Sequence, residues 1–561
     1  MNRNISDIKM PVGISDFEEI RRGGYYFVDK SALIREVLKA ASAQVMLLTR
    51  PRRFGKTIAM SMLASFFDIR KDSRSFFRDL EIMNDEDVVQ EWMNQSPTLF
   101  LSFKDVEGTR FENAFGLLRF TIAQLCITHD YLGDSSRVSE EHKRIFVRLK
   151  NQTGSLTDIQ GSLLVLMKMM QAHYGKPVIL LLDEYDVPVA KANSHGYYAE
   201  MLEIFRILMS MALEDNNALN FAVITGCLKI AMKSIFAEKN KFVSDTISSI
   251  KSKEYFGFMQ GEVDKLLEAT GLETHAESIK AWYDGYHFGD FDIYCPWDVM
   301  NYVRDLQHDP KATPASYWKN TSGNEIIRSF IDYAGSTINR KLEILLAGGY
   351  VIQKIEEDLT YDYLHSSEDN LWSILYLTGY LTKIRTGNLA EELKRGEEAL
   401  VIPNAEVREI FETTIKKWFD DSAKKWDRKP LFDAVWSGDE EKITSEMNYL
   451  LRRTISYHDY REDFYHAFLA GIFAGAGYAV ESNREYGEGR ADIVVYDMDE
   501  ARVAVFEAKY TNMQEEMEKK VQEAVRQIDK RMYAKTFEEE YDHVFCYGIA
   551  FFKKRCLVRK K

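Results

Sequence analysis

The chain has 561 residues, of which 45% are hydrophobic and 29% are charged, and its formal net charge is −14 at pH 7. This length exceeds what one compact core can hold, so we expect about three or four folding units. The composition is ordinary for a globular protein and excludes a disordered or fibrous chain. The negative charge excludes a protein coated with nucleic acid, because phosphate binding needs clustered Lys and Arg; any DNA contact must be local.

Neither a membrane span nor a disulfide framework is indicated. No stretch approaches the ~20 apolar residues of a membrane helix, and the first residues contain no apolar signal core, so we expect a cytoplasmic protein without a membrane partner. The five cysteines form no CxxC pair and no Cys/His cluster, which indicates no structural zinc site. We expect buried or unreactive thiols at Cys126, Cys227, Cys295, Cys546 and Cys556.

In chain order, the first pattern predicts a helix over 31–42, a short apolar strand over 44–49, the loop RPRRFGKT over 50–57 and a second helix over 58–69. A strand, a loop and a helix in this order are the context of a phosphate-binding P-loop.

Within this loop, Gly55 lets the main chain approach phosphate, Lys56 reaches the β and γ oxygens, and Thr57 offers its hydroxyl to Mg²⁺. Arg50 stands where the motif has its first glycine, which leaves the shape of the loop open. The predicted ATP-contacting residues of the loop are Arg53, Phe54, Gly55, Lys56 and Thr57.

The second element of a nucleotide site is PVILLLDEYDVP, in which the apolar run 177–182 is followed by acids. A buried parallel strand has this pattern, and active groups stand at its carboxyl end. We expect Asp183 to hold Mg²⁺ and Glu184 to polarise the attacking water. The alternative is a core strand that ends in capping acids, and the GKT triplet upstream argues against it.

A third strand, NFAVITGCLKI, ends in Thr225 and Gly226. In P-loop ATPases with an extra central strand, a polar residue at this point contacts the γ-phosphate, and Thr225 has that place. Lys229 either reaches the same phosphate or begins the next helix. Arg52 and Arg53 either contact phosphate or a second subunit, or belong to a solvated loop.

The motifs RPRRFGKT, LLLDEYD and ITG resemble those of the AAA-ATPase-like proteins of bacteria and archaea, as do YYFVDKS, WYDGYHFG, YCPWDVMNY, YWKNTSGNE and IPNAEV. The resemblance covers most of the first 410 residues. In that family, arginine commonly takes the first glycine position of the loop, as Arg50 does here. The resemblance implies an ATPase core that uses ATP and Mg²⁺, followed by a winged-helix or lid region.

From 248 to 455 the pattern is mainly helical, with aromatic-rich turns and no residues at catalytic spacing. His287 and the many tyrosines are expected to serve packing and turns. From its position in the chain, this region is expected to transmit nucleotide state between the two ends.

The last segment, 456–561, predicts a helix, three strands, a long amphipathic helix over 513–537 and a final strand, which together form a small mixed sheet flanked by helices. Asp492 begins the strand run DIVVYD, and Glu507 and Lys509 lie in the next strand. Because side chains alternate along a strand, these two residues face one side.

Two carboxylates bind a hard cation through oxygen, and a lysine can position the attacking water or stabilise charge in the transition state. Burying two acids and a lysine together is costly unless a metal or substrate uses them. Asp492, Glu507 and Lys509 therefore predict a site for Mg²⁺ or Mn²⁺. The alternative is a surface salt bridge on an edge strand.

The pair GRAD and FEAK resembles the core motif of the PD-(D/E)XK nuclease superfamily, with Ala491 in place of the proline. The resemblance implies a restriction-endonuclease-like α/β domain, with Glu462 as a further metal ligand and Gln527, with Tyr533, as polar residues that line the site. The residues that match the core motif are Asp492, Glu507 and Lys509, so we expect an active domain.

Together, these expectations describe an α/β multidomain protein: a P-loop domain with a parallel sheet over 1–247, a helical or winged-helix region over 248–455, and a nuclease-like domain over 456–561. The leading hypothesis is an ATP-binding, ATP-hydrolysing protein whose nuclease domain hydrolyses DNA. One alternative is a nucleotide-switched signalling or scaffold protein whose nuclease-like domain only binds nucleic acid or a partner. Another is a motor that remodels protein. The oligomeric state, a homo-oligomer included, stays open.

Overall fold

The chain forms two compact units in the computed structural model. One contains Met1–Tyr333 and Gly348–Glu412, and the other contains Ala334–Ala347 and Thr413–Lys561. The sequence predicted three domains, with boundaries after residues 247 and 455, and this division stays a prediction. The structure describes residues 8–229, 242–247, 253–318, 341–342, 344–357, 359, 367–384, 393–414, 429–454, 465, 469–470, 472–474, 478–486, 489–498, 500–532, 535, 537–538, 540–553 and 555–561.

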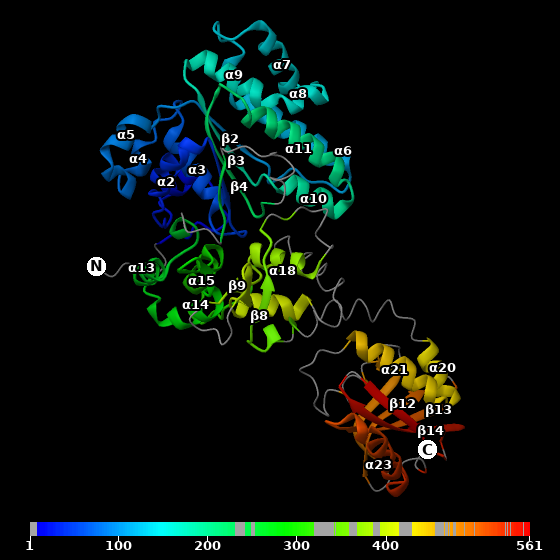
Figure 1. Ribbon diagram of the computed structural model, residues 1–561. Helices are drawn as coiled ribbons and strands as arrows, with labels where there is room; N and C mark the ends of the chain where they lie inside the picture. Colours follow the sequence, from blue (N-terminus) through cyan, green and yellow to red (C-terminus); the bar gives the residue numbers. More distant parts are fainter. Residues whose placement is uncertain are drawn as a thin grey trace. The chain divides into compact units, whose positions relative to one another are not determined.

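A parallel sheet with strand order β2-β3-β4-β1-β5 forms the centre of the first unit (Figure 1). Every residue of β1 and β3 is buried, as expected for strands covered on both faces. The sheet confirms the predicted fold class of this region, although β2 and β5 are not among the elements expected from the sequence. The strands are β1 Val45–Thr49, β2 Thr98–Ser102, β3 Val178–Asp183, β4 Leu219–Gly226 and β5 Phe242–Asp245.

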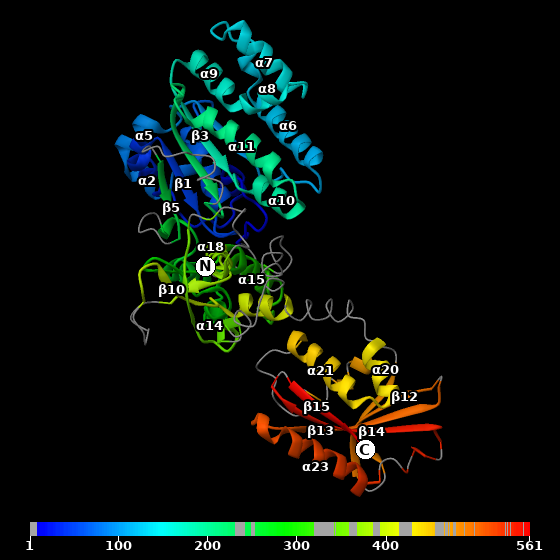
Figure 2. The same ribbon diagram turned by 45° about the vertical axis from the view of Figure 1, so that its right-hand side comes forward.

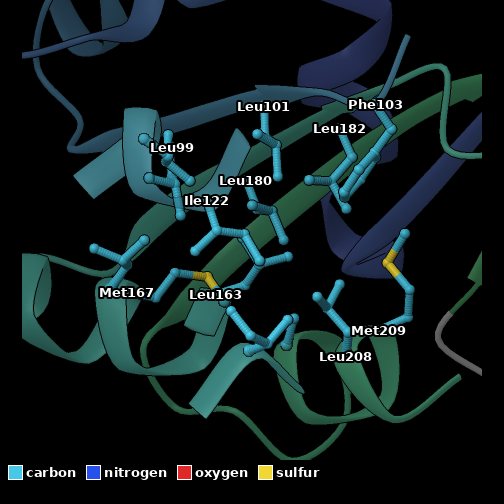
Figure 3. Close-up of a cluster of buried hydrophobic side chains, with 14 of the residues drawn as sticks. Leu99, Leu101, Phe103, Ile122, Leu163, Met167, Leu180, Leu182, Leu208 and Met209 are labelled. Atoms are coloured by element: carbon cyan, nitrogen blue, oxygen red, sulfur yellow. The ribbon is translucent and has the colours of Figure 1, made fainter. Parts of the chain in front are cut away.

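Helices cover both faces of this sheet because side chains alternate along each strand. Leu180 and Leu182 pack with Leu163 in the cluster shown in Figure 3, whereas Ile179 and Leu181 belong to the cluster of the opposite face. The first face is covered by α6 Phe111–Thr128, α7 Glu140–Lys150, α8 Leu156–Gln160, α9 Ser162–Tyr174, α10 Val187–His195 and α11 Tyr198–Leu213. The second is covered by α1 Phe17–Gly23, α2 Leu33–Ala40, α3 Lys56–Phe67, α4 Arg74–Phe77 and α5 Glu86–Trp92.

The part of the first unit after β5 is mainly helical, as expected, while its winged-helix assignment stays a prediction. A hairpin, β6 with β7, and an antiparallel sheet in the order β8-β10-β9 accompany the helices. No helix among the described residues is long and apolar enough to cross a membrane. The elements are α13 Gln260–Thr270, α14 Ala276–Tyr283, β6 Tyr286–Phe288, β7 Phe291–Ile293, α15 Pro296–His308, β8 Val351–Lys354, α18 Glu368–Leu377, β9 Thr382–Lys383 and β10 Glu397–Val401.

The second unit contains a mixed sheet in the order β11-β12-β13-β14-β15, in which β13 and β14 are parallel and the other neighbours antiparallel. The mixed sheet confirms the predicted α/β class of this region. Its strands are β11 Ala479–Tyr486, β12 Gly489–Asp497, β13 Arg502–Tyr510, β14 His543–Phe552 and β15 Arg555–Lys560. Its helices are α20 Lys429–Ser437, α21 Glu440–Thr454 and α23 Met517–Lys530.

Helices lie on both faces of this second sheet (Figure 2). Ala504 and Phe506 of β13 pack toward α20 and α21, whereas Val503 and Val505 pack with Ile528 of α23. This alternation assigns each position of β13 to one face. The odd-numbered residues of β13, which include Val503 and Val505, therefore lie on the face that α23 covers.

The basic run at the end of the chain forms β15 and pairs with acids of the same unit. Arg559 lies 3.0 Å from Glu518, and Lys561 Nζ lies 2.8 Å from Asp529. Part of this positive charge is therefore already offset by the protein's own carboxylates.

Candidate nucleotide and metal sites

The loop between β1 and α3 has a main chain suited to bind an anion. Arg53 and Gly55 have positive φ angles of 70° and 88°, with Phe54 between them. Left-handed residues at alternate positions turn successive N–H groups toward one point, and here that point lies at the N-terminus of α3. The loop therefore offers main-chain donors to phosphate.

Arg50, at the first glycine position of the motif, ties β1 to β5. Its buried side chain donates Nη1 to the carbonyls of Thr49 and Asp245 at 2.8 and 2.9 Å, and Nη2 to Asp245 Oδ1 at 3.1 Å. The guanidinium also lies 5.0 Å from the ring centroid of Phe256. The arginine thus holds neighbouring strands together, and its φ is not positive, so the main chain at this position does not require glycine.

Lys56 begins α3 and is almost fully buried. Its Nζ donates to the carbonyls of Arg50 and Pro51 at 3.1 and 2.9 Å. Burial opposes its charge, but the nearby Cys227 and the acids Glu184, Asp186 and Asp183 outweigh that effect and raise the pKa of Lys56. The loop thus holds a charged ammonium in place.

Asp183, at the end of β3, accepts hydrogen bonds from residues of β4, α3 and β2. Its Oδ1 accepts a hydrogen bond from Thr225 at 2.6 Å, and its Oδ2 accepts from Thr57 at 2.9 Å and from Ser102 at 3.2 Å. Burial raises the pKa of Asp183, and the hydrogen bonds from Thr225 and Thr57 oppose this rise. The structure therefore brings Thr57, Asp183 and Thr225 together. Ser102 is not among the predicted site residues; its only sequence signal is a polar residue that ends an apolar run.

Two further acids lie near Lys56. Glu184 has a positive φ of 54°, and its Oε1 lies 3.8 Å from Lys56 Nζ with the side chain 18% exposed. Asp186 is buried, and its Oδ2 accepts the N–H groups of Cys227 and Leu228 at 3.0 and 3.1 Å. Burial, followed by the charge of Glu184, raises the pKa of Asp186 to about 6. Of the two acids, Glu184 has the better access to solvent.

The other predicted residues of the loop are placed differently. The guanidinium of Arg53 lies 3.9 Å from the ring centroid of Trp297, and the buried ring of Phe54 lies 4.9 Å from that of Tyr286. Both side chains thus contact the region that follows β5. This leaves the main-chain N–H groups of Arg53 and Phe54 to contact a ligand. Lys229 follows β4, and both of its predicted roles stay open.

In the second unit, Asp492, Glu507 and Lys509 lie on the α23 face of the sheet. Lys509 Nζ lies 2.9 Å from Glu507 Oε1, and Asp492 Oδ2 accepts the N–H of Ala508 at 2.7 Å. The Glu507 side chain is fully buried, whereas that of Lys509 is 22% exposed. A buried carboxylate with a lysine and a second carboxylate beside it can hold a hard cation through oxygen.

Gly548 of β14 pairs with Glu507 and makes room beside it. A Cβ at Gly548 would lie 2.8 Å from the carbonyl of Val521, so only glycine lets α23 pass this close to the sheet. Gln527 lies on the same helix, half-buried. Glu462 and Tyr533 fall outside the described residues. Within the described part of the chain, no three His, Cys, Asp or Glu side chains gather as a metal site.

Comparison with known proteins finds a family model for each of the two regions. Residues 11–236 match the family model described as "Predicted AAA-ATPase", and residues 460–561 match that of the PD-(D/E)XK nuclease superfamily. These matches confirm the two resemblances that the motifs indicated.

Two similar proteins cover long parts of the chain. An uncharacterized protein in the vnfD 5′ region of Azotobacter chroococcum mcd 1 is 23% identical over 560 residues, which are 97% of this chain and 96% of that protein. A Walker-type ATPase of Pyrococcus abyssi is 15% identical, covers 73% of this chain and 99% of its own, and has a TM-score of 0.36, too low to support a conclusion. The chain thus matches the family model of an AAA-ATPase-like domain over residues 11–236 and that of the PD-(D/E)XK nuclease superfamily over residues 460–561.

Proposed function

We propose that the chain binds and hydrolyses ATP, and that its C-terminal domain hydrolyses DNA phosphodiester bonds with a divalent metal ion. The main support for the ATP site is the 2.9 Å hydrogen bond from the Thr57 hydroxyl to Asp183, beside the buried Lys56. It joins the start of α3 to the end of β3, as binding of a magnesium nucleotide requires.

At the ATP site, the residues of the chain have distinct tasks. Lys56 and the main-chain N–H groups of 53–57 bind the β- and γ-phosphates, and Thr57 and Asp183 supply oxygen ligands that suit Mg²⁺. Mg²⁺ neutralises phosphate charge when bound. Glu184 orients and deprotonates the attacking water, and Thr225 holds Asp183 in place through its 2.6 Å hydrogen bond.

At the nuclease site, the acids Asp492 and Glu507 supply oxygen donors of the kind that Mg²⁺ or Mn²⁺ prefers. A metal ion there would polarise the phosphate and the attacking water. Lys509 orients that water and offsets the negative charge that develops on phosphate. Glu462 and Gln527 remain proposed members of this site.

A plasmid-cleavage assay tests the whole proposal. Supercoiled DNA is incubated with the full chain and Mg²⁺ or Mn²⁺, with and without ATP. We expect metal-dependent nicking by the parent and none by Lys509→Ala. If the parent binds ATP but cuts no DNA in any of these conditions, a nucleotide-switched binding protein is the better account.

Replacing Glu184 with glutamine is expected to keep ATP binding and to slow hydrolysis by roughly a hundredfold or more, because an amide cannot accept the proton of water. Phosphate release and binding of a fluorescent ATP analogue are measured side by side. Glu112→Gln, an exposed acid on α6, is the control and should match the parent. Undiminished turnover in Glu184→Gln would assign the base to another acid.

A further inference from the structure

The residues just before Gly55 are held by the region that follows β5. The carbonyl of Phe54 accepts the N–H of Gly257 at 3.2 Å, and the carbonyl of Arg53 lies 3.8 Å from the thiol of Cys295. A Cβ at Gly257 would lie 3.2 Å from the Phe54 ring, so the two segments touch closely. The shape of the loop therefore depends on residues distant in the chain.

Arg53 is the strained member of this loop. Its φ of 70° lies in the left-handed region, which residues other than glycine adopt only when their surroundings enforce it. The guanidinium lies over Trp297 in the first turn of α15, 3.9 Å from the ring centroid, in a cation–π contact. Arg53 is thus anchored through both its side chain and its carbonyl.

We propose that Trp297 is a positioning residue for the ATP site, which holds Arg53 in its left-handed conformation and so shapes the loop before phosphate binds. This inference rests on the proposed function, because it takes 50–57 as the ATP loop. A loop shaped in advance binds more tightly, since the ligand does not have to order it.

Trp297 also lies half-buried in the first turn of α15, where its ring can serve the packing of the fold. That role alone does not involve Arg53. The two roles are separated by a variant in which residue 53 needs no support, because glycine adopts a left-handed conformation without strain.

The experiment measures binding of a fluorescent ATP analogue with Mg²⁺ to the full chain. Trp297→Leu is expected to weaken binding about tenfold, the equivalent of the strain at a left-handed arginine. Combining this change with Arg53→Gly is expected to restore affinity to within about threefold of the parent. Trp282→Leu, a half-buried tryptophan on α14, is the matched control and should bind like the parent.

Each result decides the inference. A Trp297→Leu variant that binds like the parent would overturn it. So would a combined variant that binds as weakly as the single one, since Trp297 would then serve only the stability of the fold. If the parent itself does not bind the analogue, the proposed ATP site fails and this inference fails with it.

Discussion

Replacing Lys56 with alanine is expected to weaken ATP binding about a hundredfold or more. The ammonium supplies charge-assisted hydrogen bonds to phosphate, and two such bonds account for a loss of this size. Without Lys56, the acids Asp183, Glu184 and Asp186 lie near the triphosphate with one cation fewer to offset them. Their repulsion adds to the loss.

Binding is measured by calorimetry with Mg²⁺ and a slowly hydrolysed ATP analogue. Because Lys56 also donates to the carbonyls of Arg50 and Pro51, alanine could disturb the loop itself. Lys56→Met keeps most of the aliphatic stem, and with it the packing at the start of α3, while it loses the charge and the N–H donors, so it should lose affinity to the same extent. Lys168→Ala, an exposed lysine on α9, should bind like the parent. Unchanged affinity in both Lys56 variants would place the nucleotide elsewhere.

The second large effect is expected at the other end of the chain. Asp492→Asn or Glu507→Gln should lower the affinity for Mn²⁺ by more than the roughly 10- to 100-fold loss that follows removal of an outer partner of a metal ligand. Lys509→Ala should keep or raise that affinity, because it removes the cation that lies 2.9 Å from Glu507 Oε1. DNA cleavage should nevertheless be lost in all three variants.

Manganese is titrated into the full chain without nucleotide, and cleavage is assayed in parallel. The control is Glu515→Gln, an exposed acid just before α23, which should bind the metal normally. If the parent binds no manganese at millimolar concentration while folded, the nuclease proposal is wrong. If Lys509→Ala loses the metal together with cleavage, the lysine acts through the structure of the site rather than in the chemistry.

Patterns within short stretches of sequence were sufficient to predict much of both domains. The apolar runs of β1, β3 and β4 predict buried strands, because a strand covered on both faces is apolar throughout. The alternation of Glu507, Ala508 and Lys509 places the two charged residues on one side, because side chains alternate along a strand. These inferences depend only on residues near one another in the chain.

The order of the strands and the partners of single side chains could not be predicted in this way. Arg50 appears in the sequence as part of a basic loop, yet in the fold it lies buried against Asp245 of β5. Arg53 appears as a phosphate ligand, yet its side chain lies over Trp297. Their partners follow them by well over a hundred residues in the chain.

The sequence by itself determined the types of the elements that flank the two sites, the phosphate loop and the acids and lysine of the nuclease domain, because their signals are local periodicity and residue chemistry. Only the tertiary structure decided the place of β5 beside β1, the packing of α20 and α21 on the nuclease sheet, and the enclosure of the phosphate loop by α15 and β6. These contacts join segments whose spacing in the chain carries no periodic signal, and they form because burial of apolar surface rewards whichever faces fit together in three dimensions.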